Sequence, residues 1–365
     1  MSKAAELANL IGNINAGGGG VNRNVIINGA MNVAQRSAAA TGLGANTSSL
    51  AERYKKCDRW AIDVEGTTIG RYTLTQDSSA PSGFANSLKL ACTTADTSIG
   101  AAELVSLNQI IEGQNVQAFA KGTADAKPFA VSFYVKGNAS ATYVCELFDG
   151  DNTRHVCKTF SVTTDWTRVE LSFPADTTGA FDDDNAASLY LQIFLHAGSN
   201  FSSGTLPATW ASKTNANRAA GGGSFFDSTD RTFFITGVQL EVGQNATEFE
   251  HEPYDVTLKK CNRYAQLLEY PTGHYVGVGF AYEAAHIRTV IAYAKKRVVP
   301  SGTLTGTLTV FHTGNDQDDA NITIAGIGVE SARLEAALTG ESTTAGYAVG
   351  YYCTTAYTIF LDSEI

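Results

Sequence analysis

The chain has 365 residues, of which 44% are hydrophobic and 17% are charged, and it carries a formal net charge of −10. This length exceeds that of a usual single domain, so two folded units and an extension are expected. The acidic balance argues against a nucleic-acid-binding surface, because phosphate contacts need clustered Lys and Arg. The only basic run, residues 295–297, is short and typical of a solvated strand end.

A short helix and a flexible linker are predicted at the N-terminus. Leu7, Leu10, Ile11 and Ile14 recur at the spacing of one apolar helical stripe, and glycines at 17–20 follow. A helix this short is marginal alone in water, so we predict that it docks against copies of itself or another protein. The alternative is a frayed terminus that folds back on its own domain. We find neither a secretion signal nor an apolar run of about 20 residues for a membrane span.

Strand signals dominate residues 24–254, where Gly, Pro, Asn and Asp mark the turns. The predicted strands are Trp60–Val64, Arg71–Gln76, Ser87–Cys92, Glu103–Ile111, Phe129–Val135, Thr142–Phe148, His155–Val162, Arg168–Phe173, Ser188–Leu195 and Thr232–Val242. Short strands without intervening helices predict a two-sheet β-sandwich.

The last of these strands alternates apolar and polar residues, which predicts one covered face. That face would hold Phe234, Thr236, Val238, Leu240 and Val242, and the other face Ile235, Gly237, Gln239 and Glu241.

The segment from Thr205 to Ser228 lacks clear periodicity. Loops of this length inside a domain are usually functional or interfacial. A glycan site needs an exposed aromatic face flanked by amide and charged donors, and this loop offers Trp210, Asn215, Asn217 and Arg218. The favoured alternative is that Trp210 anchors its own loop or packs on a neighbouring subunit.

Beyond Pro253 we predict one or two helical turns within Tyr254–Leu268 and then a small β domain. Its predicted strands are His274–Tyr282, Ala285–Ala294, Gly306–Phe311, Ala320–Ile327, Ser331–Leu338 and, with interruptions, Tyr347–Leu361. This domain is the natural place for variable recognition or for trimer contacts.

Several phrases of the sequence resemble those of virion appendage proteins of tailed bacteriophages. INGAMNVAQR at 27–36 and DRW at 58–60 resemble the opening of the jelly-roll domain in that family. ITGVQLEVG at 235–243, FEHEPY at 249–254 and CNRY at 261–264 resemble its end. The chain departs from the family at Glu252, where Arg is usual, and at Asn262, where Gln is usual. The resemblance covers roughly residues 24–266 and implies a jelly roll, a place in the virion and attachment through the N-terminus.

The chain also resembles carbohydrate-binding jelly rolls in which acidic residues near the first and last strands hold a structural Ca²⁺. Asp58 and Glu241 occupy comparable places, but two carboxylates are fewer than the six to eight oxygens that calcium takes. Surface polar residues without an ion are the favoured interpretation.

Catalytic patterns are weak. A glycan-cleaving enzyme needs two carboxylates at a defined separation, whereas Asp182–Asp184 and the acidic residues at 316, 318 and 319 lie in turn-like contexts that favour backbone hydrogen bonding. The six histidines lack ligand spacing, and the six cysteines form no C-x-x-C pair. Cys145 and Cys157 flank a turn and could face each other across a hairpin, but two buried thiols are the favoured interpretation.

We therefore predict a mainly β, non-enzymatic structural protein of a tailed-phage virion, assembled in the host cytoplasm. Residues 1–23 would form the docking helix and linker, 24–254 a jelly roll, and 255–365 a second β domain. The expected partners are other virion proteins of the tail or capsid, further copies in a homotrimer, and a host surface glycan. The alternatives are a capsid decoration or head fibre protein and a glycan-cleaving tail depolymerase. No cofactor beyond the candidate calcium, no nucleic acid and no membrane insertion are expected.

Overall fold

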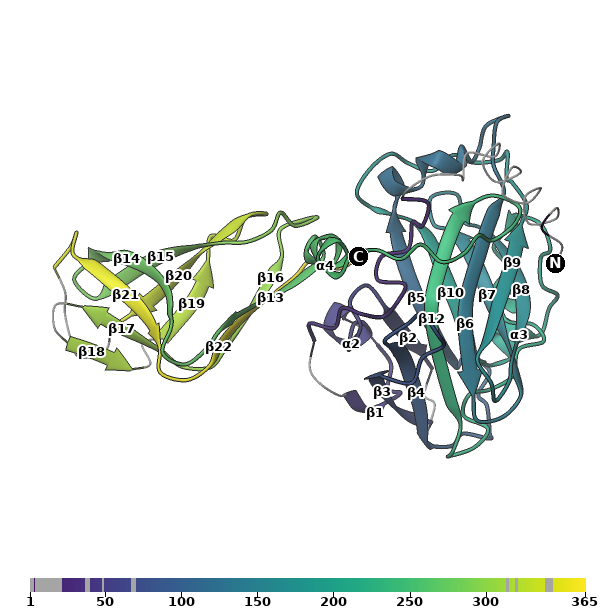
Figure 1. Ribbon diagram of the computed structural model, residues 1–365, viewed down its shortest axis with the longest axis horizontal. Helices are drawn as coiled ribbons and strands as arrows, with labels where there is room; N and C mark the ends of the chain where they lie inside the picture. Colours follow the sequence, from purple (N-terminus) through teal and green to yellow (C-terminus); the bar gives the residue numbers. More distant parts are fainter. Residues whose placement is uncertain are drawn as a thin grey trace. The chain divides into compact units, whose positions relative to one another are not determined.

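Antiparallel strands build two separate units of the chain. The computed structural model describes residue 3 and residues 22–36, 40–47, 49–66, 70–312, 315–318, 321–338 and 344–365. Unit 1 comprises Met1–Thr257 with Ile365, and unit 2 comprises Leu258–Glu364 (Figure 1). The predicted docking residues Leu7, Leu10, Ile11 and Ile14 lie outside the described residues. No helix in the described part of the chain is long and apolar enough to cross a membrane.

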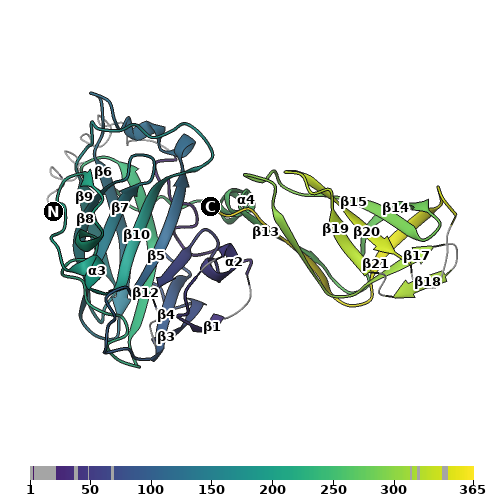
Figure 2. The ribbon, with the colours of Figure 1, turned by 180° about the vertical axis from the view of Figure 1, so that it is seen from behind.

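Unit 1 is a sandwich of two six-stranded antiparallel sheets, stacked face to face in Figures 1 and 2. Sheet A has the order β1-β3-β4-β12-β6-β9, and sheet B the order β11-β8-β7-β10-β5-β2. The strands of sheet A are β1 (Ala40–Leu43), β3 (Arg71–Asp77), β4 (Ser87–Thr94), β6 (Phe129–Gly137), β9 (Thr167–Phe173) and β12 (Thr232–Val242). Those of sheet B are β2 (Ala61–Glu65), β5 (Leu104–Glu112), β7 (Ala141–Asp149), β8 (Arg154–Val162), β10 (Ala187–Ala197) and β11 (Ala211–Ser212).

The chain passes repeatedly between the two sheets: β5 lies in sheet B, β6 in A, β7 and β8 in B, β9 in A, β10 in B and β12 in A. This alternation makes the sandwich a jelly roll, so the predicted fold class is confirmed. Every strand predicted between residues 60 and 242 is present within two residues of its predicted ends. The prediction missed β1, β11 and the short helices α2 (Leu50–Arg53), η1 (Gly113–Asn115), η2 (Gln117–Phe119), α3 (Ser199–Ser202) and η3 (Asn215–Asn217).

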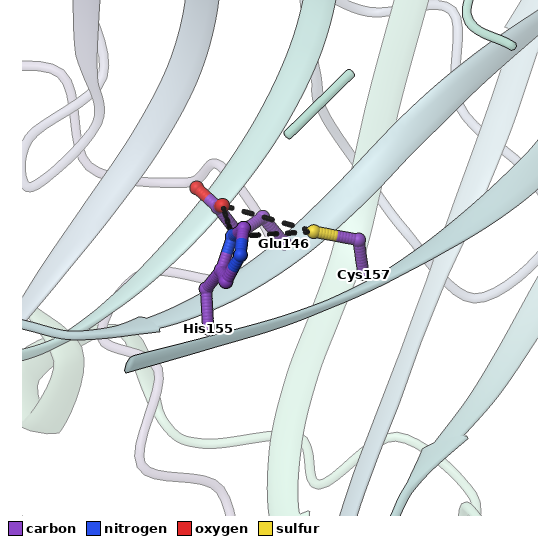
Figure 3. Close-up of side chains that lie close together, drawn as sticks. All are labelled: Glu146, His155 and Cys157. Atoms are coloured by element: carbon purple, nitrogen blue, oxygen red, sulfur yellow. Dashed lines mark hydrogen bonds and ion pairs between the residues drawn. The ribbon is translucent and has the colours of Figure 1, made fainter. Parts of the chain in front are cut away.

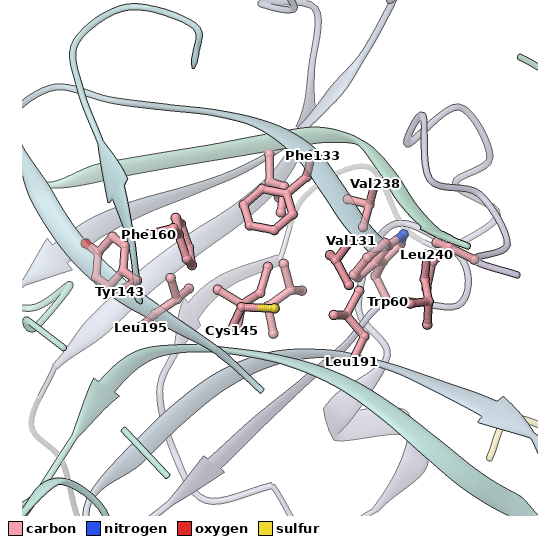
Figure 4. Close-up of a cluster of buried hydrophobic side chains, with 14 of the residues drawn as sticks. Trp60, Val131, Phe133, Tyr143, Cys145, Phe160, Leu191, Leu195, Val238 and Leu240 are labelled. Carbon is pink, nitrogen blue, oxygen red and sulfur yellow. The ribbon is translucent and has the colours of Figure 1, made fainter. Parts of the chain in front are cut away.

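Apolar side chains from both sheets meet in the core of unit 1 (Figure 4). Val131 and Phe133 of β6 point inward from sheet A, and Cys145 of β7 and Leu191 of β10 point inward from sheet B. All four are buried, as the period of two along each strand requires. The inner face of sheet B therefore packs on sheet A, and the side chains of its outer face lie outside this core.

A β-bulge in β12 overturns the predicted two faces of that strand. The pairing of β12 with β6 shifts register between Thr236 and Gln239, and Gly237 has a positive φ of 63°. The extra residue reverses the alternation, so Ile235 faces the core before the bulge and Val238 faces it after the bulge. The prediction that Phe234 and Val238 share a face is wrong, and both faces of the strand are covered rather than one.

The two phrases that carry the family resemblance lie side by side along β12. The Val25 amide donates to the Leu240 carbonyl at 3.0 Å, and the Val238 amide donates to the Gly29 carbonyl at 3.0 Å. A Cβ on Gly29 would lie 2.1 Å from the Val238 carbonyl oxygen, so only glycine permits this approach. The opening segment thus completes the edge of the last strand.

Unit 2 contains a three-stranded sheet C, in the order β13-β22-β16, and a seven-stranded sheet D, in the order β18-β17-β21-β14-β15-β20-β19. The strands of sheet C are β13 (Ala265–Tyr270), β16 (Ser301–Thr305) and β22 (Tyr357–Asp362). Those of sheet D are β14 (Tyr275–Glu283), β15 (His286–Ala292), β17 (Leu308–His312), β18 (Asn315–Asp318), β19 (Asn321–Ala325), β20 (Ser331–Ala337) and β21 (Ala348–Cys353).

The predicted helical turns within Tyr254–Leu268 are present as helix α4 (Tyr254–Asn262). Strand β13 begins at Ala265, inside the same segment, and was not predicted. Pairing of β13 with β22, from Ala265↔Asp362 to Tyr270↔Tyr357, gives this segment its strand conformation. The partner strand lies about 90 residues away in sequence, so local periodicity did not reveal it.

Candidate functional site

The outer face of sheet B carries a row of polar residues on neighbouring strands. Register pairs Asn108 of β5 with Gln192 of β10, and Gln192 with Glu146 of β7. Directly opposed residues in antiparallel strands point to the same face, so these three side chains lie next to one another. Each is buried, although it points away from the sandwich core. Buried polar groups need hydrogen-bond partners, and the row supplies them internally.

At the β2 edge of the row, Asp63 receives hydrogen bonds from two side chains. Arg53, at the end of α2, binds the Asp63 carboxylate with both Nε and Nη2, the latter at 3.1 Å. Asn108 Nδ2 donates to Asp63 Oδ2 at 2.9 Å, and Gln192 Nε2 donates to Asn108 Oδ1 at 3.0 Å. Helix α2 begins with a capping box between Ser49 and Glu52, which stabilises the helical turn that places Arg53 beside Asp63.

The row continues through Arg218, which enters from the loop before β12. Arg218 Nη2 donates to Gln192 Oε1 and to Glu146 Oε2, both at 2.7 Å, and Arg218 Nε also reaches the Glu146 carboxylate. His155 Nδ1 lies 2.7 Å from Glu146 Oε1. We call the connected set of Arg53, Asp63, Asn108, Gln192, Arg218, Glu146 and His155 the polar ladder.

Electrostatics keep the buried end of the polar ladder charged. Burial alone would raise the pKa of the Glu146 carboxyl, but the hydrogen bond from His155 and the charge of Arg218 outweigh it, so the pKa lies below its usual value. The Thr214 amide donates to His155 Nε2 at 3.4 Å, which leaves the ring proton on Nδ1 for Glu146. The loop therefore contributes both Arg218 and Thr214 to the face of sheet B.

Glu146, His155 and Cys157 form the one group in the described part of the chain whose side chains could together hold a metal ion (Figure 3). Cys157 Sγ lies 3.7 Å from Glu146 Oε1 and 3.9 Å from His155 Nδ1. Burial and the neighbouring Glu146 raise the pKa of the Cys157 thiol, so it keeps its proton in the metal-free protein, and a metal would have to displace that proton to bind. Since Arg218 already occupies the Glu146 carboxylate, the group fits a structural polar network better than a metal centre.

Two half-buried aromatic side chains lie beside the polar ladder. Phe148 of β7 and Tyr190 of β10 are directly opposed, with ring centroids 5.4 Å apart at 51°. Gly150 makes room for Tyr190, because a Cβ there would lie 3.0 Å from the tyrosine ring. Lys213 Nζ lies 4.8 Å from the centroid of Phe148. The face thus combines aromatic surface with arginine, carboxylate, amide and ammonium groups.

Asp63 and Glu146, the two carboxylates of the polar ladder, are far apart for paired acid–base catalysis. Asp63 lies on β2 and Glu146 on β7, and β5 and β10 separate these strands. Three spacings of about 4.8 Å place the two strands roughly 14 Å apart, beyond the roughly 5–9.5 Å that separates the carboxylates of glycoside hydrolases. Each carboxylate is also ion-paired with an arginine.

The four residues predicted for a glycan or interface loop lie in separate settings and form no common site. Trp210 is 7% exposed, donates from Nε1 to the Pro174 carbonyl at 2.9 Å and packs against Phe129, so it offers no exposed ring face. Asn217 Oδ1 accepts from the Thr205 amide at 3.0 Å and closes the loop. Asn215 begins helix η3. Arg218 alone joins the polar ladder.

The candidate calcium residues occupy separate hydrogen-bonded settings. Asp58 is fully buried and accepts from the backbone and side chain of Gln35 at 3.1 and 2.5 Å, with Arg36 at 3.5 Å. Glu241 is also buried and accepts from the Thr247 amide at 2.7 Å and the Thr247 hydroxyl at 2.8 Å. Both carboxylates are therefore held by protein donors, and they belong to no metal-binding group of the described residues.

The cysteines, one acidic turn and a buried histidine are each explained by burial or by hydrogen bonds within the fold. All six cysteines are free and buried, which confirms the favoured interpretation of Cys145 and Cys157 as two buried thiols. Register pairs Glu146, not Cys145, with Cys157, so the two thiols point to opposite faces of sheet B. Asp184 Oδ1 accepts from the Ala186 amide at 2.8 Å, in the backbone role that its turn context predicts. His196 is buried between Ser224 and Glu103 at 2.8 and 3.2 Å.

No family model and no curated protein matches the chain. Similar solved structures include a Clostridium thermocellum xylanase 10B fragment with CBM22-1 and GH10 modules, at 14% identity and a TM-score of 0.27, covering 51% of this chain and 26% of that one. A family 11 carbohydrate-binding module from the same organism has 13% identity and a TM-score of 0.27, covering 59% and 100%. The enzymatically active domain of bacteriophage CBA120 tailspike protein 4 has 12% identity and a TM-score of 0.29, covering 60% and 21%. Identities and TM-scores this low transfer no function to this chain.

Sequence reasoning missed most of the polar ladder and the aromatic pair. A usable signal exists, because Asn108, Glu146 and Gln192 alternate with core residues in correctly predicted strands and must point outward. The register between strands decides which outward residues become neighbours. Asn108 and Gln192 are 84 residues apart in sequence, and alternation along one strand does not give the register between them.

Proposed function

We propose that unit 1 is a non-catalytic glycan-binding domain that uses the outer face of sheet B around Phe148 and Tyr190. The observation that carries this proposal is the aromatic pair beside the polar ladder. A sugar presents apolar C–H faces that pack on aromatic rings, and hydroxyls that bind charged and amide side chains. Arg53, Asp63 and Lys213 are half-buried at this surface and offer such groups.

The proposed role is binding rather than cleavage. Asp63 and Glu146 are too far apart to act on one glycosidic bond, and both are engaged by arginines. A chain of hydrogen bonds that satisfies every member also stiffens the surface, which lowers the entropic cost of binding a ligand.

We further propose that the chain is an appendage protein of a tailed-phage virion and forms a homotrimer. Support comes from the opening and closing phrases of the jelly roll, which resemble that family and pack together along β12. Leu7, Leu10, Ile11 and Ile14 would fasten the chain to other virion proteins, and unit 1 would meet a host surface glycan.

Binding of the full-length protein to purified host-envelope polysaccharides and their fragments tests the glycan proposal. Phe148→Ala and Tyr190→Ala should each weaken binding about tenfold or more, because each removes a stacking surface. Trp166→Ala is the matched control, since this half-buried aromatic packs on Phe234 of sheet A, away from the proposed face. Equal affinities of the three variants would refute the site, and release of oligosaccharides would refute the non-catalytic role.

Incorporation into particles tests the virion proposal. Deletion of residues 1–20 should leave a folded protein that no longer joins the virion. Normal incorporation of the truncated protein would exclude the proposed anchor.

A further inference from the structure

The outer face of sheet D in unit 2 is unusually apolar. Val278 on β14 and Val290 on β15 are 73% and 67% exposed, and Phe280 on β14 is 52% exposed. The opposite face of the same sheet is buried in the core of unit 2, through residues such as Ile287 and Leu334. A strand with one covered face normally presents polar residues on the other. Strands β14 and β15 of sheet D depart from this pattern at these three positions.

The exposed apolar side chains are contiguous across neighbouring strands. Register places Val278 of β14 and Phe311 of β17 on either side of Gly350 in β21. The Tyr275 ring covers this glycine, because a Cβ there would lie 2.8 Å from it. On the other side, Val278, Phe280 and Val290 line one shallow depression of about 370 Å³. We call Tyr275, Val278, Phe280, Val290 and Phe311 the apolar face.

The size of the apolar face marks an interaction surface. An aromatic side chain offers roughly 150–250 Å² and a valine somewhat less, so these five partly exposed residues present on the order of 500 Å². Contiguous patches beyond a few hundred Å² mark interaction sites on soluble proteins. A standard interface takes about 800 Å² from each partner, so the apolar face would supply its centre and the surrounding residues its rim.

The rim beside the apolar face carries charges of both signs. Arg288 Nε lies 2.8 Å from Glu335 Oε1, and Arg333 Nη2 lies 3.2 Å from the same oxygen. Val290 is directly opposed to Arg333, so the ion pairs border the apolar centre. Because the rim holds both signs, Arg288 or Arg333 of one copy can face Glu335 of another copy of the same surface.

The chemistry of the centre favours protein over glycan. The two most exposed members, Val278 and Val290, offer neither a flat aromatic ring nor a hydrogen bond to a sugar. Sheet faces of this kind instead pack against other sheets, with interdigitating side chains about 10 Å apart. We infer that the apolar face is the surface through which unit 2 binds a second copy of this chain. This inference rests on the proposed oligomeric state and is independent of the glycan site in unit 1.

Thiol accessibility in the full-length protein tests the inference at the face itself. All six native cysteines are buried, so a new surface cysteine is the preferred target of a maleimide. Val290→Cys should react at least about ten times more slowly than Val299→Cys at concentrations where the chain is oligomeric. Val299 is the matched control, because it is an exposed valine of unit 2 (59%) that lies in no strand of sheet D. Equal rates, or a chain that sediments as a monomer at every concentration, would overturn the inference.

A charge substitution gives a second, independent measurement. Val278→Asp should raise the dissociation constant of the oligomer at least about 100-fold, because it buries an unpaired charge in the interface. Val299→Asp should leave it unchanged, and circular dichroism should show both variants folded. Since unit 1 is not altered, glycan binding by the Val278→Asp monomer should persist, which separates failure of this inference from failure of the glycan proposal.

Discussion

Arg218→Met gives the most direct test of the polar ladder, because it removes one charge and retains an apolar side chain of similar length. In the wild-type protein Arg218 is the cation that faces Glu146, a carboxylate with no exposed surface. The substitution leaves Glu146 buried with His155 and the neutral Cys157 thiol as its side-chain partners. The fold would then contain an uncompensated buried charge.

The expected loss is about 3–5 kcal/mol of unfolding free energy at pH 7, the usual cost of removing one partner from a buried ion pair. Glu146→Gln in the Arg218→Met background should recover most of this loss, because it removes the orphaned charge. The loss should also shrink as the pH falls toward 4. In the variant burial still raises the pKa of Glu146 and only His155 opposes it, so the carboxyl takes up a proton more readily than in the wild-type protein and the charge disappears.

Urea unfolding followed by tryptophan fluorescence measures this effect in the full-length protein. Trp60, Trp166 and Trp210 are the three tryptophans of the chain and all lie in unit 1, so the signal reports that unit alone. Arg231→Met is the matched control. Its partner Asp227 is 47% exposed, so the pair is worth at most about 1 kcal/mol.

Three results would refute this reasoning about the ladder. Arg218→Met could cost no more than Arg231→Met. The double variant with Glu146→Gln could be no more stable than Arg218→Met alone. The loss could also stay constant between pH 7 and pH 4. Each would mean that Glu146 is not a charged residue compensated by Arg218.

Three further predictions concern single groups. Burial lowers the pKa of His196 against the opposing effect of Glu103, so below the usual histidine pKa the unfolded state binds more protons. Unit 1 should therefore lose stability as the pH falls from 7 to 5, and His196→Gln should lessen that loss in pH-dependent urea unfolding. Burial lowers the pKa of Lys296 to about 7. Unit 2 should gain stability as the pH rises from 7 toward 10, and Lys296→Met should abolish this gain in thermal unfolding followed by circular dichroism. Trp210→Phe removes the hydrogen bond to Pro174 and should cost about 1–2 kcal/mol in urea unfolding, whereas an unchanged midpoint would show that the bond is not needed.

The jelly roll could be predicted from the sequence because its strands are long and regularly patterned. Phe129–Gly137 places core residues at 129, 131, 133 and 135, Arg154–Val162 places them at 156, 160 and 162, and turn residues end both strands. Strand β13 was not predictable in the same way. Its pairing with β22 decides its conformation, and adjacent helix α4 gives the local pattern a helical period.

The candidate site was predicted poorly because composition placed it in the wrong part of the loop. Trp210 was the conspicuous aromatic residue, but its ring packs under the loop on Phe129. The useful residue was Arg218, and its importance comes from Glu146, which lies 72 residues earlier in the chain. A long polar loop can fold onto a sheet only where its buried charges find partners, and a single sequence does not identify those partners.

Local sequence determined the long strands of unit 1 and which of their residues share a face along each uninterrupted stretch, because backbone geometry repeats every two residues. The tertiary structure decided where that repeat is interrupted, as at the Gly237 bulge, and which outward residues become neighbours. It also placed Phe148 beside Tyr190 and gathered Val278, Val290 and Phe311 on one face of sheet D. These outcomes depend on register between distant strands, and register is set by the packing of the whole sheet rather than by any one segment.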